Sequence, residues 1–422
     1  MTKQTDSIDA IVQDARRAYH SLATASTQTK NRALQATADT LQNERETIIE
    51  ANQKDLKHGQ EQGLTEALLD RLKLTPDRID SMIDGIEQVI SLEDPVGEIT
   101  GMKRRPNGLK IGQQRVPLGV IGMIYESRPN VTVDASVLCL KAGNATVLRG
   151  GSEAKHSNYL LVDLLQEAIE PFLPESTVQI LRNQDHSLVN ELLTRDQYVD
   201  VIIPRGGENL IEAVTEQSTI PVIKHYKGIC HTYVSDQADL EMAHEIVINA
   251  KTQRTSVCNA METLLLHEDL PDDFIRDLFH HLQQQDIELR VDSTLHTKFT
   301  DSPFRLEKAE KSDWNTEYLD SILSVRSVQA TTDAIHHINE FGSNHSDAIV
   351  TQNYDESERF LNEVDSAAVY VNASTRFTDG YEFGLGAEIG ISTERLHARG
   401  PMGLKELTLP KYVIYGQGQT RH

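Results

Sequence analysis

The stretch of sequence that decides the fold lies at residues 116–149 and reads VPLGVIGMIYESRPNVTVDASVLCLKAGNATVLR. Two short apolar runs, at 120–125 and 145–148, flank a segment with helical periodicity at 131–142. Strands joined by a helix-length crossover lie parallel in one sheet, because a tight turn cannot connect parallel neighbours. This stretch therefore predicts a βαβ unit.

The same alternation of strand and helix continues toward the C-terminus. Apolar runs occur at 178–181, 201–203 and 221–223, and helix-like segments separate them. A second series of alternating helices and strands follows at 237–371. We therefore expect an α/β fold with two α/β domains and parallel-type sheets, which bind ligands at the carboxyl ends of their strands.

Two regions lie outside these series. Apolar residues at helical spacing predict helices in the first hundred residues, and alternation around Leu109 and Ile111 predicts a β-hairpin at 97–116. The tail contains a strand-like run at 412–415. We expect both strand-like regions to lie outside the two sheets.

Length and charge limit the classes of function. A chain of 422 residues fits two or three domains. The 41 basic and 64 acidic side chains give a net charge of −23, which argues against a broad nucleic-acid or anionic-membrane surface. No apolar run approaches the roughly 18 residues of a membrane span, and the first residues lack a secretory signal, so we expect a cytoplasmic protein. The three cysteines have no metal-ligand spacing, so neither a metal site nor a disulfide framework is expected.

Two turns are candidates for binding phosphate groups. Arg205, Gly206 and Gly207 stand between an apolar run and a helix-like segment, where free backbone N–H groups suit a pyrophosphate. Arg149 ends an earlier strand, and together with Ser152 it could bind a ribose or its 2′-phosphate. Ordinary packing turns remain the alternative interpretation of both segments.

One cysteine has the position of a nucleophile. Cys258 follows a predicted helix at 237–252 and precedes a predicted strand at 262–267. Such a junction can give a thiolate the electropositive, partly exposed setting that it needs. Cys139 instead lies in an apolar helical segment and is interpreted as a core residue. A structural role remains the alternative for Cys258 at this point.

Four motifs carry a resemblance to known enzymes: VPLGVIG at 116–122, KAGNATVLR at 141–149, YESRPN at 125–130 and GSNHSDAI at 342–349. The first two are similar to the cofactor-domain signature of the aldehyde dehydrogenase superfamily. The other two resemble the γ-glutamyl phosphate reductase family within it, and the likeness runs in order along nearly the whole chain.

The resemblance implies an NADPH-dependent reduction of L-glutamyl 5-phosphate to L-glutamate 5-semialdehyde in proline biosynthesis. It implies that Cys258 forms a thioester as phosphate leaves and that Asn130 stabilises the oxyanion. The expected NADPH-binding residues are Arg149, Ser152, Arg205, Gly206, Gly207 and Glu317. The expected substrate-binding residues are Arg128, Arg254 and Arg376, and the sequence leaves open which arginine binds which substrate anion.

One substitution bears on the reaction type. The segment HYKG at 225–228 matches the superfamily segment whose glutamate activates water, so His225 stands where that glutamate would be. An enzyme that exchanges its thioester with phosphate should have no carboxylate base positioned to deliver water. The alternatives are a hydrolytic semialdehyde dehydrogenase, which this substitution disfavours, and an inactive structural member of the fold.

The resemblance also implies an organisation of the chain. Residues 1–99 and 119–227 are expected to bind NADP, residues 228–393 to carry the catalytic cysteine, and residues 100–118 and 394–422 to form a small oligomerisation β-extension. The expected assembly is a homodimer or a multiple of one. A glutamate kinase, which would supply the substrate, is a candidate partner.

Overall fold

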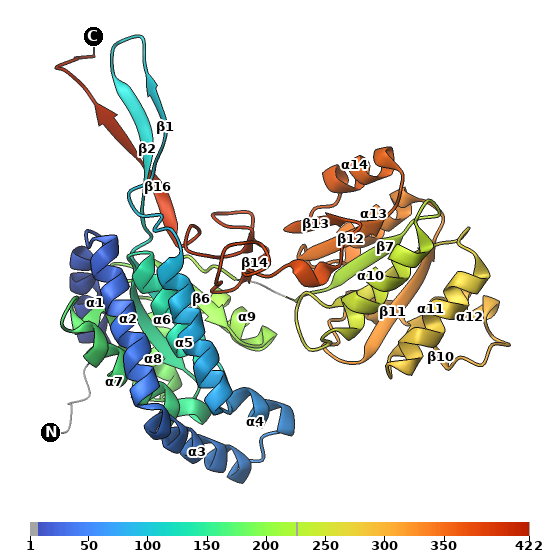
Figure 1. The fold of residues 1–422 in the computed structure, drawn as a ribbon, viewed down its shortest axis with the longest axis horizontal. Coiled ribbons are helices and arrows are strands. Elements are labelled where there is room, and N and C mark those ends of the chain that lie inside the picture. Colours follow the sequence, from blue (N-terminus) through green and yellow to red (C-terminus); the bar gives the residue numbers. More distant parts are fainter. Residues whose placement is uncertain (1–6, 225–226, 422) are drawn as a thin grey trace. The chain divides into compact units, whose positions relative to one another are not determined.

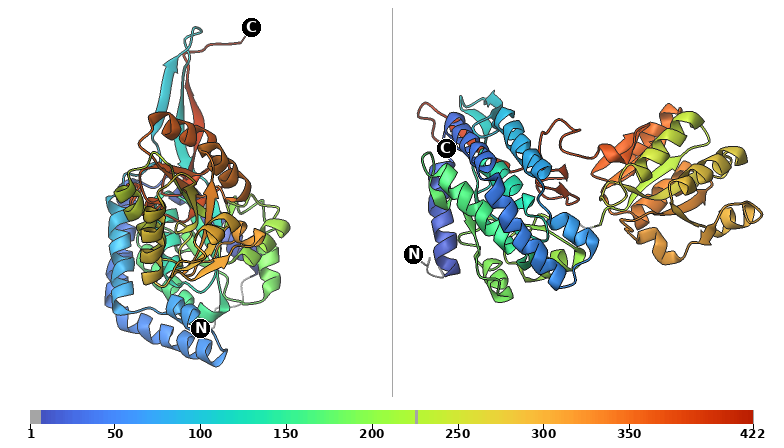
Figure 2. Two further views of the ribbon diagram at one scale, coloured as in Figure 1. Left: turned by 90° about the vertical axis from the view of Figure 1, so that its right-hand side faces the viewer. Right: turned by 60° about the horizontal axis from the view of Figure 1, so that its bottom comes forward.

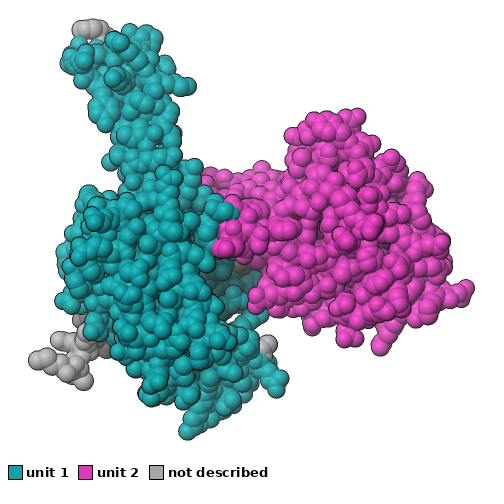
Figure 3. Space-filling view, in the orientation of Figure 1, with its two compact units in different colours: residues 1–224, 384–390, 402–422 teal, residues 225–383, 391–401 magenta. Residues whose placement is uncertain are grey.

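The computed structural model describes residues 7–224 and 227–421, which fold as two compact units. Unit 1 comprises Met1–Lys224, Gly384–Gly390 and Met402–His422, and unit 2 comprises His225–Phe383 and Ile391–Pro401 (Figure 3). Each unit contains a parallel sheet with helices, as the alternation of strands and helices predicted.

The central sheet of unit 1 has four parallel strands in the order β5–β4–β3–β6. Their bounds are Val178–Ile180, Ala145–Gly150, Val120–Tyr125 and Val201–Arg205. Every residue of β3 and β4 is buried, as expected where helices cover both faces of a parallel sheet. The predicted strand at 221–223 was wrong: Val222 makes a single bridge to Ile202, and Pro221 has no N–H with which to extend the ladder.

Nine α-helices surround this sheet among the described residues of unit 1 (Figure 1). They are α1 (Ile8–Leu22), α2 (Thr27–Asn43), α3 (Arg45–Glu61), α4 (Glu66–Leu72), α5 (Pro76–Ser91), α6 (Asn130–Lys141), α7 (Lys155–Ile169), α8 (His186–Leu192) and α9 (Glu208–Gln217). The apolar face of α1 packs against β3 and β4 through Ile8, Val12 and Ala15. Short 3₁₀ turns, η1 (Ser152–Ala154) and η2 (Glu175–Thr177), follow β4 and precede β5.

A separate antiparallel sheet extends from the helices of unit 1, as Figures 1 and 2 show. It consists of β1 (Ile99–Arg104), β2 (Lys110–Pro117) and β16 (Thr408–Tyr415), with β2 in the centre. The predicted hairpin is therefore confirmed, and the predicted tail strand is longer than expected. All residues of β1 are exposed.

Unit 2 contains a seven-stranded parallel sheet in the order β10–β9–β11–β8–β7–β12–β13. The strands are β7 (Cys230–Val234), β8 (Met261–His267), β9 (Glu288–Val291), β10 (Leu306–Lys308), β11 (Ile322–Val328), β12 (Ser346–Val350) and β13 (Ala368–Val371). The helices are α10 (Leu240–Thr252), α11 (Asp272–Gln284), α12 (Ser293–Lys298), α13 (Thr331–Phe341) and α14 (Tyr354–Glu363). The remaining elements are the 3₁₀ turns η3 (Lys311–Asn315) and η4 (Thr375–Phe377) and a small pair of strands, β14 (Ile391–Ser392) and β15 (Gly400–Pro401).

The sequence pattern did not predict β7, which lies inside this sheet. Its segment reads CHTYV, and all five residues are buried. Burial of His231 is possible because its Nδ1 lies 2.8 Å from the Asp347 carboxylate on the neighbouring strand β12. Strand β7 therefore depends on a polar pair that forms only in the folded sheet.

No helix within the described part of the chain is long and apolar enough to cross a membrane.

Candidate active site

Cys258 lies on the turn between α10 and β8, at the carboxyl side of α10 as predicted, and it is half-buried. Gly228 packs directly on its backbone, because a Cβ atom at residue 228 would lie 1.9 Å from the Cys258 carbonyl oxygen. The Gly228 N–H donates to Glu317 Oε1 at 2.9 Å, and Cys230 Sγ donates to the Cys258 carbonyl at 3.2 Å. The start of β7 therefore holds the turn that presents this thiol.

The other two cysteines are unsuited to nucleophilic chemistry. Burial raises the pKa of the Cys139 thiol to about 12, and a hydrogen bond with Thr146 opposes this only in part. Burial likewise raises the pKa of Cys230 well above its ordinary value, with the negative charge of Asp347 adding to the shift. Both thiols stay protonated near neutral pH, whereas the nucleophile must be a thiolate. Cys258 is the partly accessible thiol of the three.

Two predicted substrate-binding arginines belong to the same unit as Cys258. Arg376 lies on η4, and its Nε donates to Gln253 Oε1 at 2.9 Å. Burial lowers the pKa of Arg376, and the positive charge of Arg254 lowers it further, whereas the charge of Cys258 raises it. Arg376 thus interacts electrostatically with both Arg254 and Cys258, and an anion bound beside the two arginines would relieve the repulsion between them.

Arg128 lies in the other unit. It is exposed in the loop between β3 and α6, beside Ser127, whose φ of 44° is in the left-handed region. The structure therefore divides the three predicted arginines between the two units, with only Arg254 and Arg376 in the unit of Cys258.

Asn259, which the sequence reasoning missed, connects the cysteine turn to the arginine turn. Its Nδ2 donates to the carbonyl oxygens of Thr378, at 2.8 Å, and Arg376, at 3.3 Å. Its own carbonyl accepts from Thr375 Oγ1 at 2.8 Å. No spacing in the sequence indicates these contacts, since the partners are more than a hundred positions away.

Glu317 also takes part in holding the cysteine turn, through its bond to Gly228. Burial raises the pKa of the neighbouring Glu262 to about 7, and the negative charge of Glu317 adds a smaller effect in the same direction. Glu262 and Lys251 form a buried ion pair at 2.7 Å, between the end of α10 and β8. Lys251 precedes the Cys258 turn and Glu262 follows it, and the sequence did not predict that they pair.

A cavity of about 920 Å³ opens in unit 1 beside the carboxyl ends of β3 and β4. Its lining includes Arg149 and Ser152, as expected for a nucleotide pocket of this architecture, and residues of α3, α8 and α9. Arg149 is buried, with one guanidinium nitrogen donating to the Gly150 carbonyl and another 3.4 Å from the Gln184 carbonyl. Its Nε has no hydrogen-bond partner among residues 7–224 and 227–421.

A carboxylate lies in this cavity beside Arg149. Glu153 accepts from the N–H and the hydroxyl of Ser127 at 2.5 and 2.8 Å. Burial lowers the pKa of Arg149, and Tyr159 and then Glu153 oppose that shift. The pocket therefore combines a buried cation, which attracts a phosphate, with an acidic group that repels one.

The turn at Arg205, Gly206 and Gly207 precedes α9 as predicted, but the N–H of Gly207 is not free. Glu126 Oε2 accepts from it at 3.0 Å, so a carboxylate occupies the position that the sequence suggested for a pyrophosphate. A Cβ at residue 206 would lie 2.4 Å from the same oxygen. The expectation of free backbone donors was therefore wrong for Gly207, and the glycine at 206 makes room for Glu126.

Asn130 is the first residue of α6, and its Nδ2 donates to Asp134 Oδ2 at 2.9 Å. Burial raises the pKa of Asp134 to about 6, against the opposing effects of Asn130 and Arg205. Two predicted site residues, Asn130 and Arg205, thus interact with one aspartate that the sequence reasoning missed. Both belong to unit 1, and His225 lies outside the described residues.

Comparisons with known proteins identify the family of the chain. The aldehyde dehydrogenase family model matches residues 1–301. A gamma-glutamyl phosphate reductase of Carboxydothermus hydrogenoformans is 53% identical over 417 residues, which cover 99% of this chain and all of the relative. The crystal structure of the gamma-glutamyl phosphate reductase of Thermotoga maritima is 45% identical, covers 99% of this chain and 100% of its own, and superposes with a TM-score of 0.96.

A more distant solved structure shares the fold. An engineered glycolyl-CoA reductase with bound NADP⁺ is 16% identical, covers 97% of this chain and 96% of its own, and has a TM-score of 0.67. The family match and the identity over almost the entire length lead to one assignment. The chain belongs to the aldehyde dehydrogenase family of oxidoreductases and, within it, to the gamma-glutamyl phosphate reductases.

Proposed function

We propose that this protein reduces L-glutamyl 5-phosphate to L-glutamate 5-semialdehyde with NADPH and releases phosphate, a step of proline biosynthesis. The observation that carries the proposal is the setting of Cys258: a partly accessible thiol on a glycine-packed turn, near Arg376, which interacts electrostatically with both Cys258 and Arg254. An acyl phosphate that carries an α-carboxylate needs a nucleophile for its carbonyl carbon and cations for its anionic groups.

Cys258 acts as the nucleophile in this scheme. Its thiolate attacks the acyl carbon, the carbon–oxygen bond to phosphate breaks, and the phosphate leaves with the bonding electron pair. The cofactor, when bound, supplies the hydride that reduces the resulting thioester to the aldehyde level. Collapse of the thiohemiacetal then releases the aldehyde and restores the thiolate of Cys258. Asn130 and backbone N–H groups near Cys258 are the proposed donors to the oxyanion.

The residues of unit 1 fit a nicotinamide dinucleotide, the type of cofactor used by this enzyme family. The buried Arg149 lines a cavity large enough for a nucleotide, and its Nε lacks a hydrogen-bond partner in the described part of the chain. Arg149 and Ser152 would bind the 2′-phosphate of NADPH. Arg205, Gly206 and Gly207 would lie under the nicotinamide ribose, since Glu126 accepts from the Gly207 N–H that a diphosphate would need. Glu317, which belongs to unit 2, would bind the ribose hydroxyls.

The proposal includes an assembly and a cellular context. The sheet of β1, β2 and β16 exposes Tyr412, Ile414 and Tyr415 at 70%, 59% and 59%. Exposed apolar and aromatic residues on a projecting sheet suit a subunit interface, so we propose a homo-oligomer built through this sheet. A cytoplasmic enzyme that takes its unstable substrate from a glutamate kinase is consistent with this role.

The direct experiment runs the reaction in both directions. Glutamyl phosphate is generated in place by a glutamate kinase, NADPH oxidation is followed by absorbance, and the product is identified by mass spectrometry. In reverse, NADP⁺ reduction by glutamate semialdehyde should require inorganic phosphate. Oxidation that proceeds equally without phosphate and yields free glutamate would instead establish a hydrolytic dehydrogenase and overturn the proposal.

A further inference from the structure

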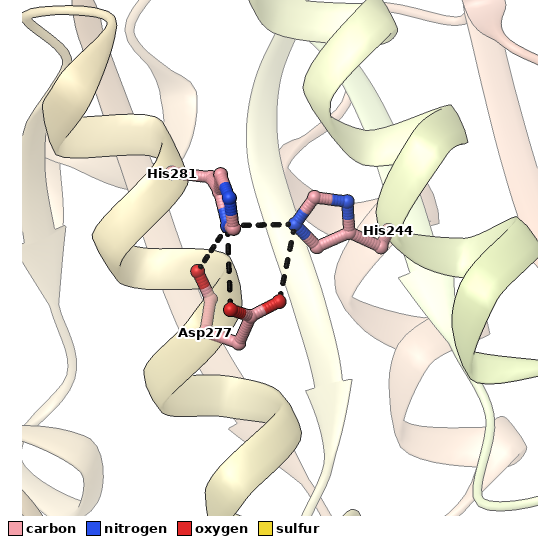
Figure 4. Close-up of side chains that lie close together, drawn as sticks. All are labelled: His244, Asp277 and His281. Carbon is pink, nitrogen blue, oxygen red and sulfur yellow. Dashed lines mark hydrogen bonds and ion pairs between the residues drawn. The ribbon is translucent and has the colours of Figure 1, made fainter.

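Two helices of unit 2 bring together a group of side chains that commonly bind metal ions, and none of these residues belongs to the sequence motifs described above. His244 comes from α10, and Asp277 and His281 come from α11, which packs against it (Figure 4). Asp277 and His281 are four residues apart and so project from one face of α11. Their sequence separation from His244 is 33 and 37 positions, which is why no motif indicated the group.

The donor atoms lie close enough together to approach one ion, because one ligand atom from each of the three side chains lies within 4.8 Å of the other two. The shortest distances from His244 and from His281 to Asp277 involve different carboxylate oxygens. His244 Nε2 lies 3.1 Å from His281 Nδ1 and 3.5 Å from Asp277 Oδ2, and His281 Nδ1 lies 3.5 Å from Asp277 Oδ1. In a tetrahedral zinc site with bonds of about 2.0–2.1 Å, neighbouring donors are about 3.3–3.4 Å apart. The three side chains therefore require little movement to bind one ion.

The chemistry of the donors selects the class of ion. Two imidazole nitrogens and a carboxylate suit Zn²⁺, Co²⁺ or Ni²⁺, whereas Mg²⁺ and Ca²⁺ prefer oxygen ligands throughout. Two ring nitrogens 3.1 Å apart must share a proton when no ion is bound, and a metal ion would instead accept both lone pairs. His281 Nδ1 also lies 2.9 Å from the Asp277 carbonyl oxygen, so metal binding through Nδ1 requires the tautomer of His281 that carries its proton on Nε2.

Access to the group is open. The His244, Asp277 and His281 side chains are 24%, 59% and 43% exposed, so water can complete the coordination. A cavity of about 410 Å³, lined from His244 to Gln253, adjoins the His244 side of the group. We propose that His244, Asp277 and His281 bind one divalent transition-metal ion, Zn²⁺ being the best match, and that the ion crosslinks α10 and α11. This site was not expected from the sequence, which suggested no metal.

The test measures binding independently of activity. Tag-free protein with Cys258→Ser, which removes the accessible thiol as a competing ligand, is freed of metal with a chelator and titrated with CoCl₂. We expect one equivalent to give the visible absorption of tetrahedral Co²⁺, and ZnCl₂ to displace it and raise the unfolding temperature. His244→Ala and His281→Gln should each weaken binding at least about tenfold, as even indirect partners of metal ligands do.

The matched control is His280→Ala, which removes the neighbouring imidazole on the same helix. The His280 ring contacts Gln284 and lies edge-on to the His281 ring, with 5.8 Å between the ring centroids, but it supplies no donor atom to the group. Its loss should therefore leave binding within about twofold of the parent. Asp277→Asn provides a third variant that keeps the size of the side chain and removes its charge. Circular dichroism establishes that each variant is folded. The proposal is overturned if the parent protein binds no Co²⁺, or if folded His244→Ala, His281→Gln and Asp277→Asn proteins all bind as the parent does.

Discussion

Replacement of Gly228 by alanine should disable the enzyme without unfolding it. The added Cβ would lie 1.9 Å from the carbonyl oxygen, 2.6 Å from the carbonyl carbon and 2.7 Å from the Cα of Cys258. Ordinary contacts are 3.4–4 Å, so the two backbones must separate by about 1.5 Å. The neighbouring atoms are backbone rather than a flexible side-chain end, so the displacement must fall on the turn that carries the nucleophile.

The expected size of the effect follows from that displacement. A misplacement of about 1 Å at a reacting group can cost about 10²-fold in rate, and overpacking costs typically about 1–3 kcal/mol of stability. We therefore expect Gly228→Ala to lower kcat/KM for semialdehyde oxidation about 100-fold. The hydrogen bond from Gly228 to Glu317 should be strained at the same time.

The assay compares three measurements with a matched variant. Steady-state kinetics, the rate at which iodoacetamide alkylates Cys258, and urea unfolding are measured for Gly228→Ala and for Gly85→Ala. Gly85 lies within α5, and no atom lies within 4 Å of the position that its Cβ would occupy. Gly85→Ala should therefore leave kcat/KM unchanged and slightly raise the free energy of unfolding. A folded Gly228→Ala enzyme with kcat/KM within threefold of the wild type would refute the reasoning that this contact positions the nucleophile.

Three further outcomes are expected. Cys258→Ala should abolish the reaction in both directions, while NADPH binding, measured by fluorescence titration, stays nearly unchanged. The control Cys139→Ala should leave the reaction rate almost unchanged. A tenth of the wild-type rate in Cys258→Ala would contradict the assignment. Arg149→Ala should lower the ratio of kcat/KM for NADPH to that for NADH by about 10- to 100-fold, because a charge-assisted hydrogen bond of roughly 1.5–3 kcal/mol is lost. An unchanged ratio would mean that the 2′-phosphate binds elsewhere. Truncation after Pro410, which removes most of β16, should give a monomer or an aggregate in light scattering, whereas an intact oligomer would exclude β16 from the interface.

The sequence by itself determined the architecture and the position of the cysteine that we propose as the nucleophile. The strands β3, β6 and β11 and the helix α9 follow from local patterns, because an apolar run or a helical period depends on neighbours along the chain. The same holds for the cysteine at the junction between α10 and β8, where a secondary-structure boundary is visible in the pattern of residues. The family motifs then assigned a chemistry to that cysteine.

Only the tertiary structure decided how the site is held. Strand β7 can be buried because His231 forms a hydrogen bond with Asp347 on the neighbouring strand. Its polar residues interrupt the apolar run by which a buried strand is predicted from sequence. Glu126 reaches the N-terminus of α9 from 81 positions away and occupies a donor that the sequence suggested for a phosphate. The His244, Asp277 and His281 group likewise arises from the packing of two helices. Contacts of this kind join residues that are close in space but distant along the chain, so no local pattern in a single sequence predicts them.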